Sequence, residues 1–275
     1  MSVQTYKNVI VEKNDGLTWV TLNRPDQRNA MSPELDAEML DIVLGLEGDP
    51  ETRVVILTGA GESFCAGMDL KLYFRALENK PGDRIRAEWI THQWRWYRLW
   101  NFPKPTIAMV NGFCMGGAFT QLIACDFAFA ADDATFGLSE VNWGILPGGM
   151  VSKALDVCLG YRDAMYYTMT GESFDGRKAE EIKLITKAVP AADLRQTTED
   201  FARRFLKLNP ETLRATKQAV KAVRDMDFGQ AHEYLMAKSN ELRARDREDG
   251  YSQGIKQFVD DKTYKPGLGA YKRPE

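Results

Sequence analysis

The stretch TIAMVNGFCMGGA, residues 106–118, carries the strongest indication of fold and chemistry in this chain. Its first five residues are apolar or β-branched, which is typical of a buried strand. Near its end stands the glycine pair Gly116 and Gly117. Because glycine has no Cβ, a ligand can approach its backbone closely. The stretch therefore predicts a buried strand that leads into a backbone binding site.

A second segment of this kind, SFCAGMD, residues 63–69, follows the apolar run at 54–58. If the two runs are strands of one sheet, their ends can present two backbone N–H groups to one point. Such a pair of donors stabilises a carbonyl oxygen that becomes negative during a reaction. The two segments together predict chemistry that passes through an enolate.

A carboxylate follows in FGLSE, residues 136–140. A glutamate taken alone is more often a surface charge. Glu140, however, has Phe136, Leu138 and Trp143 as apolar neighbours in sequence. Apolar surroundings raise the pKa of a carboxyl group and suit it to acid and base catalysis. The apolar setting therefore favours a Glu140 that lies in the site rather than on the surface.

Predicted strands and helices alternate at spacings too long for hairpins, which favours an α/β fold with a mostly parallel sheet. After about residue 192 the pattern is helical only, so we expect a core at 1–191 and a helical C-terminal region at 192–275. The predicted strands are 9–12, 17–22, 54–59, 106–110 and 127–130. The first predicted helix opens at Ser32, its N-cap, and the later ones cover 83–101, 115–125, 192–207, 211–225, 228–245 and 252–260.

Composition excludes several classes of function. The net charge of −3 gives no reason to expect nucleic acid or an anionic membrane as a partner. The chain shows neither a signal peptide nor an apolar run of transmembrane length. Its four cysteines show no CxxC spacing, which indicates buried free thiols rather than a metal site. We expect a cytoplasmic protein without a metal.

With these residues in hand, the chain resembles the crotonase (enoyl-CoA hydratase/isomerase) superfamily over nearly its whole length. The resemblance implies a ClpP/crotonase-like fold of repeated ββα units that make two near-perpendicular sheets, with a helical C-terminal region used for trimers or pairs of trimers. It places the two N–H donors of the oxyanion hole on Met68 and Gly117. Members that hydrate enoyl-CoA generally use two glutamates for acid and base catalysis. One of these positions is Thr120 here, and the other is Glu140, so the resemblance implies that Glu140 is the acid/base group.

The chain is more similar to the hydroxycinnamoyl-CoA hydratase-lyases. This resemblance implies hydration of a 4-hydroxycinnamoyl-CoA and retro-aldol cleavage to a 4-hydroxybenzaldehyde, such as vanillin, and acetyl-CoA. It implies no separate cofactor, because coenzyme A enters as the substrate thioester. The segments that carry the resemblance are 59–62, 66–71, 73–74, 104–112, 134–140, 256–262 and 265–268.

The same resemblance assigns the remaining site residues. Tyr73 corresponds to one of two tyrosines that hold the substrate phenol, and Met236 stands at the other, on a neighbouring subunit. Thr120 replaces a serine close to the site and keeps its hydroxyl. Arg28 is expected near the phosphates of coenzyme A, with the Ala30 backbone nearby. Further expected substrate contacts are Ala66, Gly67, Asp69, Leu70, Lys71, Gly116 and Gly144.

Two alternatives stay open from the sequence. The chain could be a crotonase-fold hydratase or isomerase for another acyl-CoA, which would turn over aliphatic enoyl-CoAs better than aromatic ones. It could also be an inactive crotonase-fold protein that serves in binding or assembly. The intact Glu140 and both hole positions count against the second alternative.

Overall fold

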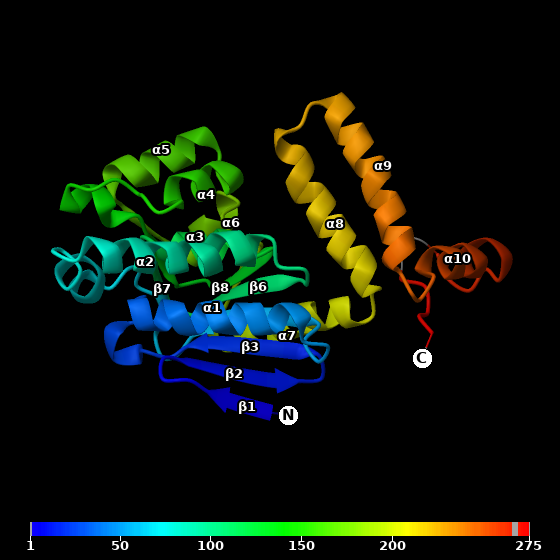
Figure 1. Ribbon diagram of the computed structural model, residues 1–275, viewed down its shortest axis with the longest axis horizontal. Helices are drawn as coiled ribbons and strands as arrows, with labels where there is room; N and C mark the ends of the chain where they lie inside the picture. The colour runs from blue at the N-terminus through cyan, green and yellow to red at the C-terminus, as the bar shows by residue number, and fades with distance from the viewer. Residues whose placement is uncertain (1, 266–268, 275) are drawn as a thin grey trace.

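Two β-sheets form the body of the protein in the computed structural model, which describes residues 2–265 and 269–274. The larger sheet has seven strands, and every pairing beyond its N-terminal hairpins is parallel, as predicted. Helices cover this sheet (Figure 1). Its strands, in spatial order, are β1 (Ser2–Thr5), β2 (Val9–Asn14), β3 (Leu17–Leu22), β4 (Val54–Gly59), β6 (Thr106–Val110), β8 (Phe127–Ala131) and β11 (Lys187–Val189).

Local sequence signals set the first elements as predicted. Strands β2 and β3 pair antiparallel across a turn whose Asp15 and Gly16 both have positive φ. Helix α1 (Pro33–Gly48) begins after Ser32, whose side chain accepts a hydrogen bond from the Leu35 amide at 3.1 Å. This N-cap satisfies one of the free N–H groups of the first turn. The predicted hairpin and the predicted helix start are both confirmed.

The family resemblance implies a second sheet, and the structure has one, but the residue pattern did not predict its strands. It has four strands in the order β10 (Ser173–Asp175), β9 (Thr135–Gly137), β7 (Phe113–Met115) and β5 (Ser63–Cys65). Strands of three residues are too short to show a period of two. The prediction of a helix from 115 was also wrong at its start, because Met115 pairs with Gly137 in this sheet. Helix α3 (Ala118–Ala124) begins only after Gly117.

Further helices lie between and around the sheets. The predicted helix at 83–101 is α2 (Pro81–His92), which continues as a π-helical segment, η3 (Gln93–Arg98). Another π-helical segment, η2 (Leu70–Arg75), follows the segment 63–69. A short 3₁₀ helix, η4 (Ser139–Trp143), contains Glu140. Beyond η4 come α4 (Val151–Cys158), α5 (Tyr161–Thr170) and α6 (Gly176–Glu181).

The C-terminal region is helical, as predicted. Helix α7 (Ala191–Leu206) packs on the large sheet and buries Leu194, Thr198 and Ala202. Helices α8 (Pro210–Ala222) and α9 (Phe228–Arg245) instead form a hairpin that stands off the body, with α10 (Gly250–Ile255) beyond it (Figure 1). The predicted boundary near 191 thus falls at the start of α7, whereas the part that stands apart begins at α8.

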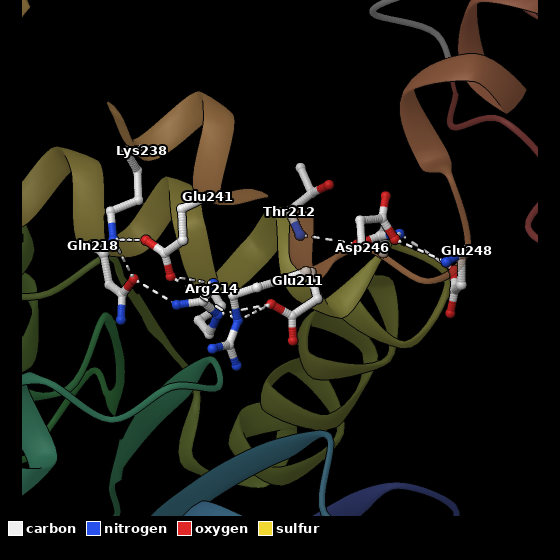
Figure 2. A network of polar contacts seen from close by, with 10 residues as sticks. Glu211, Thr212, Arg214, Gln218, Lys238, Glu241, Asp246 and Glu248 are labelled. Carbon is white, nitrogen blue, oxygen red and sulfur yellow. Dashed lines mark hydrogen bonds and ion pairs between the residues drawn. The ribbon is translucent and has the colours of Figure 1, made fainter. Parts of the chain in front are cut away.

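Polar contacts hold this helical hairpin. Arg214 of α8 donates to Glu241 of α9 at 2.9 Å, and Lys238 pairs with the same carboxylate (Figure 2). Lys217 and Lys221 of α8 reach back to Asp126 of the body at 2.7 and 2.8 Å. Burial lowers the pKa of Lys217 to about 8, although Asp126 opposes that shift. The hairpin is therefore joined to the body by charged groups.

Two expectations from composition can be compared with the structure. All four cysteines are free, and Cys65, Cys114 and Cys125 are buried, as predicted. Across residues 2–265 and 269–274, no helix combines the length and the apolar character needed to cross a membrane. Residues 266–268, which belong to the last segment of the family resemblance, lie outside the described residues.

Candidate active site

A pocket of about 960 Å³ opens where strands β5 and β7 end. The two glycine-marked segments form one wall, and η4 with the loop after it forms another. Turn η2 and helix α2 complete it. Its lining residues include Ala66, Gly67, Met68, Leu70, Tyr73, Phe74, Thr91, Arg95, Gly116, Gly117, Glu140, Trp143 and Gly144. The structure thus brings the main predicted residues to one place.

The two predicted N–H donors lie on adjacent segments of this wall. Strands β5 and β7 pair in parallel, and Gly67 adopts a φ of +86° where its chain passes Gly117. A Cβ on Gly67 would lie 2.8 Å from the Met115 carbonyl and 3.4 Å from the Gly117 nitrogen, so glycine is required there. Neither the Met68 nor the Gly117 amide donates a hydrogen bond within the described chain. Both remain available to a ligand oxygen.

The Glu140 carboxylate faces these donors across the pocket. A Cβ on Gly116 would lie 3.1 Å from Glu140 Oε1, so the carboxylate reaches the glycine pair. Its Oε2 is buried and has no hydrogen-bond partner in the described residues. Burial raises the pKa of Glu140 above its ordinary 4.5. An unpaired carboxyl of this kind can accept and return a proton at neutral pH.

Tyr73 lines the pocket but is buried, with 5% of its surface exposed. Its hydroxyl donates to the Asp36 carboxylate and contacts Thr91 Oγ1 at 2.5 Å. Burial and the nearby Asp36 charge raise the pKa of Tyr73, so the phenol stays protonated. Tyr73 therefore offers the pocket an oxygen that can accept a hydrogen bond.

Sequence reasoning missed the residues behind Tyr73. Asp36, Thr91 and Arg95 are all buried. Arg95 Nη1 donates to the Gly117 carbonyl at 2.9 Å and so fixes the peptide next to the oxyanion hole. One signal was present: Asp36 stands three and seven residues before Met39 and Val43, on the buried face of α1. A charge on an apolar helix face marks a special position.

Other predicted contacts have different surroundings. Thr120 is buried and does not line the pocket, but its hydroxyl donates at 3.3 Å to the carbonyl of Gly149, which does line it. Asp69 pairs with Arg24 at 3.0 Å and accepts from the amides of Lys71 and Leu72, which caps η2. Neither Asp69 nor Lys71 lines the pocket. Asp69 thus supports the wall from behind.

Of the remaining predicted contacts, two line the pocket and three do not. Arg28 is exposed and lies over the Phe113 ring at 5.0 Å, while its carbonyl accepts from the Ala66 amide. The carbonyl of Ala30 accepts from Arg24. Leu70 and Gly144 line the pocket. Met236, on α9, is 55% exposed and does not reach the pocket of its own chain.

Comparison with known proteins agrees with this geometry. The chain is 52% identical over 271 residues to the hydroxycinnamoyl-CoA hydratase-lyase of Pseudomonas fluorescens, covering 98% of each. It is 32% identical to the (E)-benzylidenesuccinyl-CoA hydratase of Thauera aromatica, covering 88% of this chain and 94% of the relative. It matches a crystal structure of an enoyl-CoA hydratase from Bacillus anthracis with a TM-score of 0.83 and 28% identity, covering 97% and 99%.

These likenesses bear out the resemblance that the sequence showed. The fold is that of the crystallised hydratases, with the helical C-terminal region included in the match. The enoyl-CoA hydratase/isomerase family matches residues 12–265, which include every predicted site residue. The chain belongs to the enoyl-CoA hydratase/isomerase family.

Proposed function

We propose that this protein hydrates a 4-hydroxycinnamoyl-CoA, such as feruloyl-, p-coumaroyl- or caffeoyl-CoA, and then cleaves the product to a 4-hydroxybenzaldehyde and acetyl-CoA. One observation carries the proposal: two free amide donors and one unpaired carboxylate face the same pocket. The 52% identity to a hydroxycinnamoyl-CoA hydratase-lyase supports the choice of substrate.

Hydration uses the two sides of the pocket together. The Met68 and Gly117 amides hold the thioester oxygen as it becomes an enolate oxygen. Glu140 takes a proton from water as the water oxygen attacks Cβ, and then returns a proton to Cα. A single carboxylate is enough because the same group accepts and then gives back a proton.

Cleavage reuses the same groups. Glu140 takes the proton of the β-hydroxyl, the Cα–Cβ bond breaks, and its electron pair forms the acetyl-CoA enolate in the oxyanion hole. Glu140 then protonates the enolate carbon. Because both steps develop charge on the same oxygen, one pair of amides serves both.

Coenzyme A enters as part of the substrate, so the proposal needs no further cofactor. The backbone of the exposed residue Arg28 lies beside the segment that carries the oxyanion hole, because its carbonyl accepts from the Ala66 amide, and its guanidinium lies over the Phe113 ring. A guanidinium pairs well with phosphate. We assign Arg28, with the Ala30 backbone, to the phosphate end of the substrate.

We further propose assembly as a trimer, or a pair of trimers, in which α9 of one chain closes the pocket of the next. Helix α9 has no buried residue in the isolated chain, and Phe228, Leu235 and Met236 are exposed along it. Exposed apolar surface of this kind marks an interface. Sedimentation of the purified protein checks the assembly, and a single-chain mass would refute it.

The decisive experiment mixes purified protein with feruloyl-CoA and follows the thioester, vanillin and acetyl-CoA. Vanillin and acetyl-CoA in equal amounts support the proposal. Loss of the thioester without aldehyde identifies a hydratase only. No change with feruloyl-CoA but turnover of crotonyl-CoA identifies a hydratase or isomerase for another acyl-CoA, and no turnover at all identifies a binding protein.

Changing Tyr73 to phenylalanine tests recognition of the phenol. We expect the rate of aldehyde formation from feruloyl-CoA to fall about tenfold, the worth of one hydrogen bond, while crotonyl-CoA hydration keeps its rate. Steady-state assays with both substrates measure the difference. An equal loss with both would assign Tyr73 to structure rather than to the phenol, and circular dichroism verifies that the variant is folded.

The raised pKa of Glu140 sets the pH dependence. As the base toward water Glu140 must be ionised, so kcat/KM falls as the pH falls through its pKa. We expect the midpoint of this acid limb to lie above 4.5, because burial raises that pKa. Initial rates of crotonyl-CoA hydration between about pH 4 and pH 8 locate the midpoint. A midpoint at or below 4.5 would contradict the assignment.

A further inference from the structure

Asp36 is a carboxylate buried in the core without a salt bridge. None of its surface is exposed, and it forms no ion pair with a lysine or arginine of the described chain, although the charge of Arg95 acts on it. Its Oδ1 accepts from Trp94 Nε1 at 2.8 Å, and its Oδ2 accepts from Thr91 Oγ1 at 2.5 Å and from the Tyr73 hydroxyl. Burying a charge without an ion-pair partner costs free energy of folding, which indicates that Asp36 has a role beside the pocket.

The hydroxyl groups of Tyr73 and Thr91 connect Asp36 to the pocket by hydrogen bonds. Tyr73 and Thr91 line the pocket, whereas Asp36 does not. Because the Tyr73 proton points to Asp36, the tyrosine oxygen keeps a lone pair for a donor in the pocket. A phenol bound there would donate to Tyr73, and Tyr73 already donates to Asp36. The three groups form a chain along which a proton can pass.

The electrostatics of Asp36 suit a proton acceptor. Burial raises its pKa, and the positive charge of Arg95 opposes that rise without cancelling it. Arg95 is itself buried and close to both Asp36 and Tyr73. It therefore limits the cost of a negative charge on this chain of groups, while the carboxylate keeps its affinity for a proton.

We infer that Tyr73 relays the phenol proton of the substrate to Asp36 while the carbon–carbon bond is cleaved. This inference rests on the proposed function, because it needs a 4-hydroxyaryl substrate at Tyr73. It gives the protein a second proton-accepting carboxylate, which acts through Tyr73 and never touches the substrate.

The step balances as follows. Glu140 takes the β-hydroxyl proton, the oxygen forms the aldehyde carbonyl, and the Cα–Cβ electron pair passes to the acetyl-CoA enolate. The new carbonyl withdraws electrons from the ring, so the phenol becomes a stronger acid as it forms. The phenol proton moves to Tyr73 and the Tyr73 proton moves to Asp36. Glu140 then protonates the enolate, and Asp36 returns its proton to the phenol oxygen through Tyr73.

The relay helps only while the aldehyde forms. A phenolate para to the new carbonyl delocalises its charge onto that carbonyl oxygen, which the intact β-hydroxy substrate cannot do. An interaction that strengthens toward the transition state speeds the step. The relay therefore speeds the cleavage of 4-hydroxyaryl substrates and leaves the rate of every reaction without a phenol proton unchanged.

Asp36→Asn tests the relay, because asparagine keeps the shape of the side chain but cannot take up the proton. The substrate is the β-hydroxyacyl-CoA of the feruloyl series, and its 4-methoxy analogue, which has no phenol proton, is the matched control. We expect D36N to slow cleavage of the 4-hydroxy compound at least tenfold. A general acid or base that acts directly on the substrate contributes about 10²–10⁴ in rate, and Asp36 acts only through Tyr73. Cleavage of the 4-methoxy analogue and hydration of crotonyl-CoA should keep their rates.

Trp94→Phe serves as a control variant. It removes the hydrogen bond to Asp36 Oδ1 and leaves Oδ2, the relay oxygen, in place. We expect the ratio of 4-hydroxy to 4-methoxy cleavage to stay as in the unmodified protein. If D36N loses activity equally with all three substrates, or with none, the relay is refuted. If the unmodified protein forms no aldehyde from either the feruloyl substrate or its hydrated form, the proposed function itself fails.

A measurement on the unmodified protein covers the case in which D36N does not fold. Single-turnover cleavage in D₂O should show a larger solvent isotope effect for the 4-hydroxy substrate than for its 4-methoxy analogue, because more protons move in the first. Equal isotope effects would overturn the relay without any variant.

Discussion

Changing Glu140 to alanine is expected to abolish both hydration and cleavage while the protein stays folded. Glu140 is the carboxylate in the pocket with an oxygen that no described group satisfies, and both proposed steps move a proton through it. Loss of a general acid–base group costs about 10²–10⁴ in rate. We expect kcat/KM for feruloyl-CoA and for crotonyl-CoA to fall by at least about 10³, measured by steady-state assays with both thioesters.

Glu88→Gln is the matched control for this loss. Glu88 also lines the pocket, but it is exposed and pairs with Arg84 at 2.8 Å. We expect this variant to keep its activity. Turnover by the Glu140 variant equal to that of the unmodified protein would remove the proposed mechanism, and loss of cleavage alone would limit Glu140 to the second step.

Changing Gly117 to proline is expected to remove half of the oxyanion hole. The φ of Gly117 is −53°, close to the value that a proline ring imposes, and the ring takes the place of the N–H. Removing one donor of this kind costs about 10²–10³ in kcat. We expect that loss in hydration and in cleavage alike, measured as kcat with feruloyl-CoA and crotonyl-CoA.

Gly117→Ala separates the lost donor from simple crowding. Alanine keeps the N–H, and its Cβ would lie 3.1 Å from Arg95 Nη1 and 3.3 Å from Met68 Cγ, a tight but adjustable fit. We expect alanine to keep most of the activity that proline loses. If the two variants lose activity to the same extent, crowding explains the effect and the Gly117 amide is not a donor in the reaction.

Most elements of the large sheet could be predicted because their signals are local. The Asp15–Gly16 turn and the Ser32 N-cap depend on residues within a few positions of each other. The four-stranded sheet could not be predicted in this way. Its strands are three residues long, and β7 pairs with β5 and β9, which lie far from it in sequence. Pairing of that kind depends on tertiary packing rather than on local preference.

The site shows the same division. The two glycine-marked segments and Glu140 could be predicted to meet from the residue pattern, and the family resemblance then named Met68 and Gly117 as the donors; all three residues line the pocket. The contacts of Asp36 with Thr91 and Trp94 could not, because they join α1 to α2 and η3 across more than 50 residues. For Asp69 the prediction and the structure differ. It was predicted to contact the substrate because it stands within a functional segment, but its contacts are a helix cap and an ion pair with Arg24.

The charged contacts that hold α8 against α9 have a consequence for the conditions in which the protein works. Helix α9 buries no residue and α8 buries only Ala215, so pairs such as Arg214–Glu241 hold the two helices together. The Arg214 and Glu241 side chains keep 11% and 36% of their surface exposed, so salt reaches this pair from the carboxylate side. Such a pair weakens as ionic strength rises, since the Debye length shrinks to about 3 Å at 1 M salt. Concentrated salt should therefore loosen this hairpin while leaving the two sheets intact. Activity that depends on α9 would then fall with salt before the fold does.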